Sequence, residues 1–370
     1  MDLSFSEEQR ALRDLVRKIL EAEVTPGRLR EVEAGPEWFD RALWSELGRA
    51  GLLGICVPEE HGGSGGGVLE ACILLEEIGR TVAPIPAWPT LVLGALPVAQ
   101  FGTDDQWRRL LPGVSAGDAV LTAALAEPRE DDPAPVLVEA ERDGSSWLLT
   151  GSVPMVPAAH VAARILVPAR TAAGEAGIFL ADPSADDVST VRQETTTGEP
   201  RFELTLAGTS VDGSDLLVEP GADDAAVRWL VERATVGLCA TAVGLAERAL
   251  EMTAEYTTGR EQFGRPLASF QAVQQRAADA YIDVQAMRWT MWEAAWRLSE
   301  GLPAAEHVAV AKFWAAEGGQ RVLAAAQHLH GGIGVDVEYP LYRYTRWAKL
   351  TELTLGGAGR HLARLGTELR

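Results

Sequence analysis

Charged, aromatic and amide side chains are grouped within one short segment of the chain, GREQFGRPLASFQ at Gly259–Gln271. Arg260 carries a planar, permanently charged guanidinium whose N–H groups suit phosphate oxygens. Phe263 offers a flat ring that can lie against another ring or a sugar, and the Gln271 amide can hydrogen-bond a ligand. Because Arg260 and Arg265 lie close together, the segment predicts binding of a phosphate-bearing, ring-containing ligand.

A second segment, HLHGG at His328–Gly332, offers a backbone suited to the same task. Gly331 and Gly332 lack a Cβ, so the chain there can approach a bound group closely. Each segment also has an ordinary interpretation. Arg260 could pair with a neighbouring glutamate on the surface, and the glycine pair could simply end a helix. The occurrence of both segments in one chain favours ligand binding over these interpretations.

Helical periodicity dominates the first third of the chain. Ser6 and Gln9 have the spacing of a capping box, and an apolar stripe follows them at helical spacing. Further helices are predicted at about Trp38–Ala50 and Val68–Gly79. We therefore expect residues 1–118 to form an N-terminal helical domain.

The middle of the chain changes to short apolar runs separated by turn residues, which is typical of strands. Asp143 and Gly144 lie between two such runs and predict a hairpin turn. The expected strands lie at about Val136–Ala140, Trp147–Thr150, Ile165–Val167, Gly177–Leu180, Phe202–Leu206 and Leu216–Val218. Residues 119–220 are therefore expected to form a β domain of ordinary size.

Long helices return in the last part of the chain. They are predicted at about Val227–Thr258, Gln271–Leu298, Pro303–Gly332 and Tyr342–Leu355. Gly244 is one of several small residues that allow close approach of another helix. Trp289, Trp292 and Trp296 recur at helical spacing and are expected to pack inside the bundle. We expect residues 221–370 to form a C-terminal helical bundle.

Composition and charge restrict the function. The 370 residues carry a formal charge of −20, which argues against a general binder of nucleic acid or of an anionic membrane. The three cysteines are scattered, as expected of buried thiols in a reducing compartment. The N-terminal residues lack the layout of a signal peptide, and the apolar run Leu91–Phe101 is too short to span a bilayer. A cytoplasmic protein is expected.

The sequence lacks the motifs of several other classes of functional site. There is no HExxH or cysteine–histidine cluster for a metal ion. The glycine run at Gly62–Gly67 is not followed by the Lys-Ser/Thr of a P-loop. No GxSxG nucleophile elbow occurs.

The α–β–α order, PEEHGGSG at Pro58–Gly65, REQFGRPLASFQ and HGGIGVDVEYP together resemble the acyl-CoA dehydrogenase family over nearly the whole chain. The resemblance implies an α+β fold, with an N-terminal helical domain, a middle β-barrel-like domain and a C-terminal four-helix bundle that enclose FAD and an acyl-CoA thioester. It implies electron-transfer flavoprotein as the acceptor. The residues that it assigns to FAD are Arg260, Gln262, Phe263, Leu267, Phe270, Gln271, His328, Leu329, Gly331 and Gly332. In this family the HGG segment serves the FAD of a neighbouring subunit, and His328 here replaces the commoner glutamine.

The position of the family's catalytic glutamate is occupied by Leu355 in this sequence. That glutamate removes the α-proton of the thioester, and leucine cannot accept a proton. The alternative position used by some members is Ala234, and Glu232 lies on another face of the same helix. Glu352, one turn before Leu355, is a possible substitute. No catalytic residue is therefore assigned in this chain.

The flavin-ring half of the site departs from the family as well. Ala126-Glu127-Pro128 replaces the usual Thr-Glu-Pro, and Met155-Val156-Pro157 replaces Trp-Ile-Thr. This asymmetry resembles one subunit of the heteromeric acyl-CoA dehydrogenases of bacterial sterol side-chain degradation. There, a catalytic subunit supplies the glutamate and the ring pocket, and the base-less partner completes the FAD site in a heterotetramer with two copies of each.

Three alternatives remain open at this point. The chain could be a self-sufficient homotetrameric dehydrogenase that uses Glu352 or another acid as its base. It could be a flavin-free structural or regulatory homologue. It could also use the same fold for other flavin chemistry, such as that of an oxidase.

Overall fold

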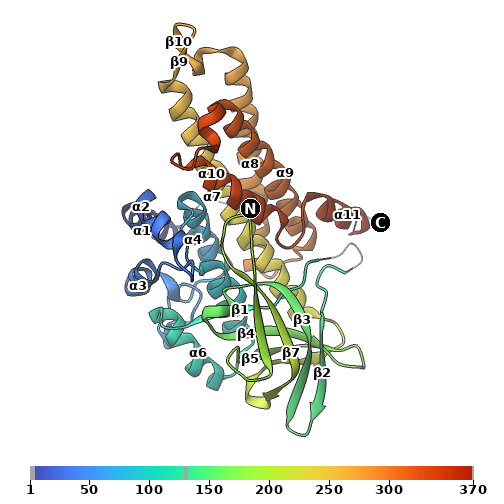
Figure 1. Cartoon of the computed structure of the whole chain (residues 1–370). Helices are drawn as coiled ribbons and strands as arrows, with labels where there is room; N and C mark the ends of the chain where they lie inside the picture. Colours follow the sequence, from blue (N-terminus) through green and yellow to red (C-terminus); the bar gives the residue numbers. More distant parts are fainter. Residues whose placement is uncertain (1–4, 129–131, 369–370) are drawn as a thin grey trace. The chain divides into compact units, whose positions relative to one another are not determined.

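The computed structural model describes residues 5–128 and 132–368 of the chain (Figure 1). Among these residues, contacts define two compact units. Unit 1 lies within Met1–Leu29, Cys72–Ala83 and Thr235–Arg370, and unit 2 lies within Arg30–Ala71 and Pro84–Ala234. The helices α2 (Pro26–Ala34), α4 (Val68–Thr81) and α7 (Ala225–Gly259) have residues in both units. The predicted division at residues 118 and 220 stays a prediction.

Unit 1 is helical, and its longest elements run beside one another. The helices besides α4 and α7 are α1 (Glu7–Glu23), α8 (Gln271–Ser299), α9 (Ala305–His330), α10 (Leu341–Leu353) and α11 (Ala358–Glu368). The short elements are β9 (Glu261–Gln262), β10 (Arg265–Pro266), and the 3-10 turns η6 (Leu267–Ser269) and η7 (Gly331–Val335). Helix α8 packs along α9, which also contacts α10 and α11.

The ends of these helices follow from local sequence. The capping box predicted at Ser6 is confirmed, because the Gln9 N–H donates to Ser6 Oγ and the Ser6 N–H donates to Gln9 Oε1. Helix α9 ends at His330, and Gly331 then adopts a φ of +66°, as the glycine pair predicted. The same helix begins at Ala305 rather than at Pro303, where it was predicted to begin.

An 18-residue stretch of α7 is apolar enough to span a membrane by composition, but it is 89% buried, as core helices are.

Helices α4 and α7 touch backbone to backbone within unit 1. A Cβ added at Gly244 would lie 1.9 Å from the carbonyl oxygen of Glu76, and one at Gly79 would lie 2.1 Å from that of Thr241. Any side chain at these positions would force the two helices apart. The prediction that Gly244 permits close approach of another helix is therefore confirmed.

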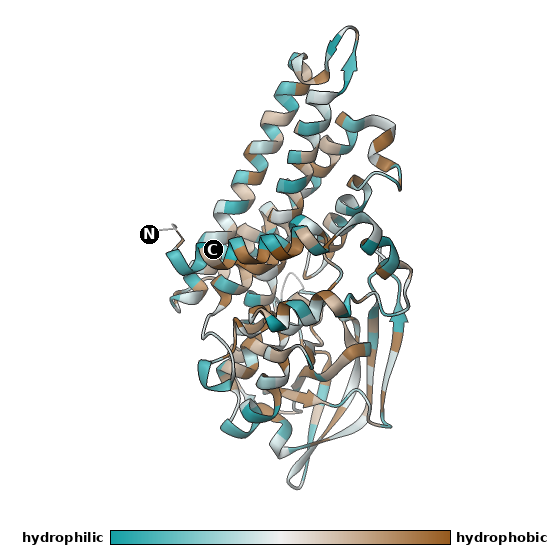
Figure 2. Cartoon of the chain, turned by 90° about the vertical axis from the view of Figure 1, so that its left-hand side faces the viewer, coloured by the Kyte–Doolittle hydropathy of each residue, from teal (hydrophilic) through white to brown (hydrophobic). Residues whose placement is uncertain are grey.

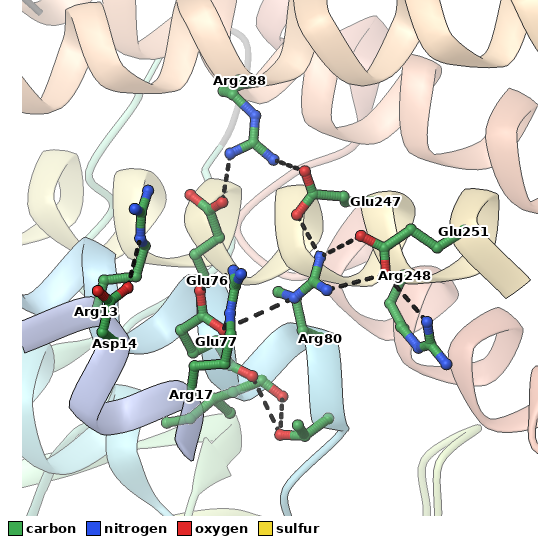
Figure 3. A network of polar contacts seen from close by, with 12 residues as sticks. Arg13, Asp14, Arg17, Glu76, Glu77, Arg80, Glu247, Arg248, Glu251 and Arg288 are labelled. Carbon is green, nitrogen blue, oxygen red and sulfur yellow. Dashed lines mark hydrogen bonds and ion pairs between the residues drawn. The ribbon is translucent and has the colours of Figure 1, made fainter. Parts of the chain in front are cut away.

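A network of ion pairs surrounds this contact (Figure 3). Its main members are Arg17 of α1, Glu76, Glu77 and Arg80 of α4, Glu247 and Glu251 of α7, and Arg288 of α8. Arg288 donates to Glu76 at 2.5 Å and to Glu247 at 2.7 Å. Burial raises the pKa of Glu76, and the Arg288 guanidinium opposes that shift. Because each buried carboxylate depends on an arginine from another helix, the network fixes the relative position of four helices.

Unit 2 contains helices and one mixed sheet. Its helical elements besides α2, α4 and α7 are η1 (Leu52–Gly54), η2 (Glu59–His61), η3 (Trp88–Ala95), η4 (Ala159–Val161), η5 (Gly213–Asp215), α3 (Arg41–Arg49), α5 (Leu96–Phe101) and α6 (Asp104–Ala116). Its strands are β1 (Val120–Ala123), β2 (Val138–Asp143), β3 (Ser146–Pro157), β4 (Ala162–Arg170), β5 (Ala176–Ala181), β6 (Val188–Gln193), β7 (Arg201–Asp212) and β8 (Leu216–Gly221). The strand order is β6-β7-β3-β2-β4-β5-β8, and β1 pairs in parallel with β4.

The sheet confirms the strands predicted from the middle of the chain. Strands β2 and β3 form the expected hairpin, in which Asp143 pairs with Ser146 and Gly144 has a φ of +61°. The core of the sheet includes the fully buried side chains of Leu149, Ile165 and Phe179. Strands β1 and β6 were not predicted; β1 is wholly buried and short, so it lacks alternation.

We predict that Gly244→Ala destabilises the protein by about 3 kcal/mol, because the added methyl would overlap the Glu76 carbonyl. Denaturant unfolding followed by far-UV circular dichroism would measure the change. Gly259→Ala on the same helix is the matched control, because a Cβ there meets nothing within 4 Å. The control should stay within about 1 kcal/mol of the wild type. Equal stability of both variants would contradict the close contact.

Candidate cofactor site

The first predicted segment forms a β-hairpin where α7 gives way to α8 (Figure 1). Strands β9 and β10 pair through the two-residue turn Phe263-Gly264, whose φ angles are +56° and +77°. Glycine adopts such angles freely, whereas a bulky residue with positive φ is strained. Phe263 is nevertheless 92% exposed, and its ring lies edge-to-face with that of Phe270, at 6.3 Å between centroids. A strained turn that presents a bare aromatic ring indicates a binding role.

Cationic groups flank this ring. The Arg260 side chain is exposed, and its carbonyl accepts the Leu267 N–H at 2.8 Å, which closes the base of the hairpin. The Arg265 guanidinium lies 4.0 Å from the centre of the Phe270 ring, in cation–π contact. Figure 2 shows the hairpin strands as predominantly hydrophilic. The two arginines and the exposed ring fit the phosphate and ring groups of a dinucleotide.

The structure brings the other residues predicted in this segment to the same place. Gln262 is exposed in β9, Leu267 lies in η6, and Phe270 is the residue before α8. Gln271 is the first residue of α8, which starts without a side-chain cap. The positive end of a long helix dipole therefore adjoins the two arginines and adds to their attraction for anions.

The second predicted segment ends α9 and begins η7. Gly331 and Gly332 are exposed, and a Cβ at either would meet nothing within 4 Å. Leu329 is half-buried. His328 is exposed and lines an open groove on α8 and α9, together with Arg276 and Arg321. The glycine backbone is thus accessible, as the prediction requires.

One aromatic contact joins the two segments. Tyr256, in the last turn of α7, stacks on His330 with 4.5 Å between ring centroids and 18° between ring planes. Tyr339 closes the cluster, because its hydroxyl lies 3.1 Å from His330 Nε2. These three residues were not among the predicted site residues. A sequence signal existed, since Tyr256 begins the YTTGREQF run and His330 lies within HLHGG.

Leu355 follows α10 in a buried and strained position. Leu355 is 2% exposed and has a φ of +56°. Its carbonyl accepts a hydrogen bond from His361 Nε2 at 2.9 Å, and burial lowers the pKa of His361 to about 4. The imidazole is therefore neutral at pH 7, and residue 355 contributes an aliphatic side chain.

Glu352, the possible substitute acid, is engaged elsewhere. Its carboxylate pairs with Lys349 at 2.5 Å, and its carbonyl accepts from Lys312 Nζ at 3.1 Å. Lys312 is 1% exposed and also donates to the carbonyl of Thr351. The lysine satisfies carbonyl groups at the end of α10, where a cation is favoured. Both roles of Glu352 are structural in this arrangement.

In unit 2, the segment that replaces Trp-Ile-Thr is a bulge of β3. Met155 has a φ of +61°, and its N–H donates to Gln193 Oε1 at 2.8 Å. Pro157 has no N–H to donate, and its carbonyl accepts from Thr122 Oγ1 at 2.8 Å. The Met155 N–H and the Pro157 carbonyl are therefore both hydrogen-bonded within unit 2.

Two family models match the chain. The N-terminal domain model of acyl-CoA dehydrogenase matches residues 6–118, and the C-terminal domain model matches residues 221–369. The acyl-CoA dehydrogenase FadE27 of Mycobacterium tuberculosis is 40% identical over 377 residues, which cover 100% of this chain and 99% of FadE27. The chain therefore belongs to the acyl-CoA dehydrogenase family of FAD-dependent oxidoreductases.

Two solved structures agree with the predicted α+β fold. The ChsE4–ChsE5 complex of Mycobacterium tuberculosis contains a chain with a TM-score of 0.93 and 40% identity, covering 100% of this chain and 99% of that one. A variant of the Tcur3481–Tcur3483 steroid acyl-CoA dehydrogenase gives a TM-score of 0.90 and 44% identity, covering 98% of each chain. Both comparisons confirm the resemblance to heteromeric members of the family.

We predict that His361 makes the protein sensitive to acid. Its folded pKa is about 4, whereas the unfolded side chain takes up its proton near pH 6.5. Stability should therefore fall as the pH drops from about 6.5 to 4, by roughly 3 kcal/mol from this group. In His361→Gln the amide still donates to Leu355 but cannot titrate. Unfolding measured at several pH values should show a weaker dependence in this variant, and an identical dependence would refute the assignment.

Proposed function

We propose that this chain is the base-less subunit of a heteromeric, FAD-dependent acyl-CoA dehydrogenase of the cytoplasm. It would form a heterotetramer with a catalytic subunit and complete that subunit's FAD site. The observation that best supports this proposal is a contrast between two places in unit 1. The hairpin presents a strained, 92% exposed Phe263, while the buried position after α10 is filled by Leu355. In this proposal the chain keeps the nucleotide-binding features and leaves the base to its partner.

The reaction is the α,β-desaturation of an acyl-CoA thioester. FAD, when bound, accepts the β-hydrogen as hydride, and electron-transfer flavoprotein is the proposed acceptor of the electrons. The α-proton must leave to a positioned group that can take it. Leu355 has no such group, and Glu352 is paired with Lys349. A carboxylate of the partner subunit therefore removes the proton in this proposal.

The role of this chain is to hold the nucleotide part of the cofactor. Arg260 and Arg265, beside the start of α8, bind the pyrophosphate oxygens. The Phe263 ring would lie against the adenine or ribose, and Gly331 and Gly332 would let the backbone approach the cofactor. The flavin ring would lie in the partner, since the Met155 N–H of this chain is hydrogen-bonded to Gln193.

The surface of unit 1 supports a protein partner. Most of the exposed large apolar side chains in the described residues belong to this unit, including Tyr281, Ile282, Trp289 and Val335. Trp289 is 54% exposed, so the expectation that it packs inside the bundle was wrong. A subunit interface would cover such residues. The similar ChsE4–ChsE5 structure is a complex, which supports a heteromer. The similar Tcur3481–Tcur3483 protein is a steroid acyl-CoA dehydrogenase, which supports a steroid acyl-CoA as the substrate.

We predict that Arg260→Ala weakens FAD retention by the co-purified complex by about ten- to a hundredfold, because a charge-assisted hydrogen bond to phosphate is lost. Equilibrium dialysis with flavin absorbance would measure it. Arg228→Ala, at an exposed arginine of α7, is the control and should bind FAD normally. A complex that never contains FAD would support the flavin-free alternative and refute the proposal.

We predict that Leu355→Ala and Glu352→Gln leave the rate of substrate α-proton exchange by the complex within about threefold of wild type. Neither substitution removes the proposed base. Loss of proton abstraction in Glu352→Gln alone would instead identify a self-sufficient dehydrogenase. That outcome would be accompanied by a yellow, active chain purified without a partner.

A further inference from the structure

The hydrogen bonds of His330 define the state of its ring. Nδ1 lies 2.8 Å from the carbonyl oxygen of Ala326, and a carbonyl can only accept, so Nδ1 carries a proton. Nε2 lies 3.1 Å from the Tyr339 hydroxyl, which donates to it. Burial lowers the pKa of His330, in agreement with a neutral ring. Both nitrogens are therefore used in one tautomer.

The third contact of this ring reaches the other segment of the candidate site. Tyr256 stacks on it, and the Tyr256 carbonyl accepts the Arg260 N–H at 2.9 Å. The stacked ring thus fixes the helical turn from which Arg260 departs. On the other side, His330 is the residue directly before Gly331.

We propose that His330 is a positioning residue that clamps the hairpin at Arg260–Gln271 to the Gly331–Gly332 backbone, so that both contact the dinucleotide as one rigid unit. This inference rests on the proposed function of the site. It assigns no chemical step to His330. Its effect on FAD is transmitted through Tyr256 on one side and through the backbone of η7 on the other.

His330 makes two hydrogen bonds that an apolar ring packed at the same place could not make. An apolar ring could occupy the volume beside Tyr256 and keep the stack. The imidazole in addition accepts from Tyr339, which lies beyond η7, and donates to the preceding turn of α9. Its orientation is thereby fixed by partners on both sides of the glycine pair. Loss of both hydrogen bonds should loosen the hairpin by about tenfold in its local opening equilibrium.

Hydrogen–deuterium exchange of the full chain tests the clamp without reference to activity. His330→Phe keeps the stack and removes both hydrogen bonds, and Tyr339→Phe removes one donor in a variant that retains His330. We expect about tenfold faster exchange in residues 260–270 and 331–335 for His330→Phe, with exchange in β3 and β7 unchanged. His330→Gln, which retains a donor and an acceptor but loses the stack on Tyr256, should keep much of the protection in residues 331–335 and lose protection in residues 260–270. His307→Gln, on the same helix, is the control.

The FAD readout uses the same variants in the co-purified complex. FAD should be released about tenfold faster from both His330→Phe and His330→Gln than from the wild-type complex, because each variant loses one part of the clamp. Unchanged local exchange in both His330→Phe and Tyr339→Phe would overturn the clamp. Faster exchange with unchanged FAD release would overturn its role in positioning. A wild-type complex without FAD would overturn the proposed function, and the exchange data would still decide whether the two segments are clamped.

Discussion

Helices α4 and α7 approach so closely that backbone meets backbone, and the arrangement of unit 1 depends on this contact. The space for a side chain at Gly79 and Gly244 is already taken by carbonyl groups of the opposite helix. Such an approach leaves little freedom for sliding or rotation, because interiors are close-packed. The hairpin follows the end of α7. The position of the candidate site therefore depends on the contact between α4 and α7, which lies farther back along the same helix.

The ion pairs beside this contact fix how the helices are oriented relative to one another more than they raise the free energy of unfolding. Buried arginine–glutamate pairs repay their desolvation only when the geometry is good, and a lone member would be costly. Arg80 donates to Glu251 at 2.9 Å, and Arg288 bridges Glu76 and Glu247. Each of these pairs links different helices. A shift of one helix would therefore leave several buried charges without their ion-pair partners. Such a network selects one packing of the bundle over near alternatives.

Much of the fold could be predicted from the sequence, because local signals determine it. The capping box at Ser6, the turn at Gly144 and the helix end at Gly331 each depend on residues a few positions apart. Contacts between distant segments could not be predicted in this way. The stack of Tyr256 on His330 and the bond from Met155 to Gln193 depend on tertiary placement. The exposure of Trp289 was missed because periodicity identifies a helix face and not what covers it.

The backbone at position 355 has a consequence for which side chains this position can accept. The left-handed conformation of Leu355 is supported by a hydrogen bond from His361 to its carbonyl, which does not depend on the identity of the side chain. A different residue could occupy the same scaffold without rebuilding the loop. The side chain at position 355, acidic residues included, could therefore change by a single substitution while the backbone of the loop stayed the same.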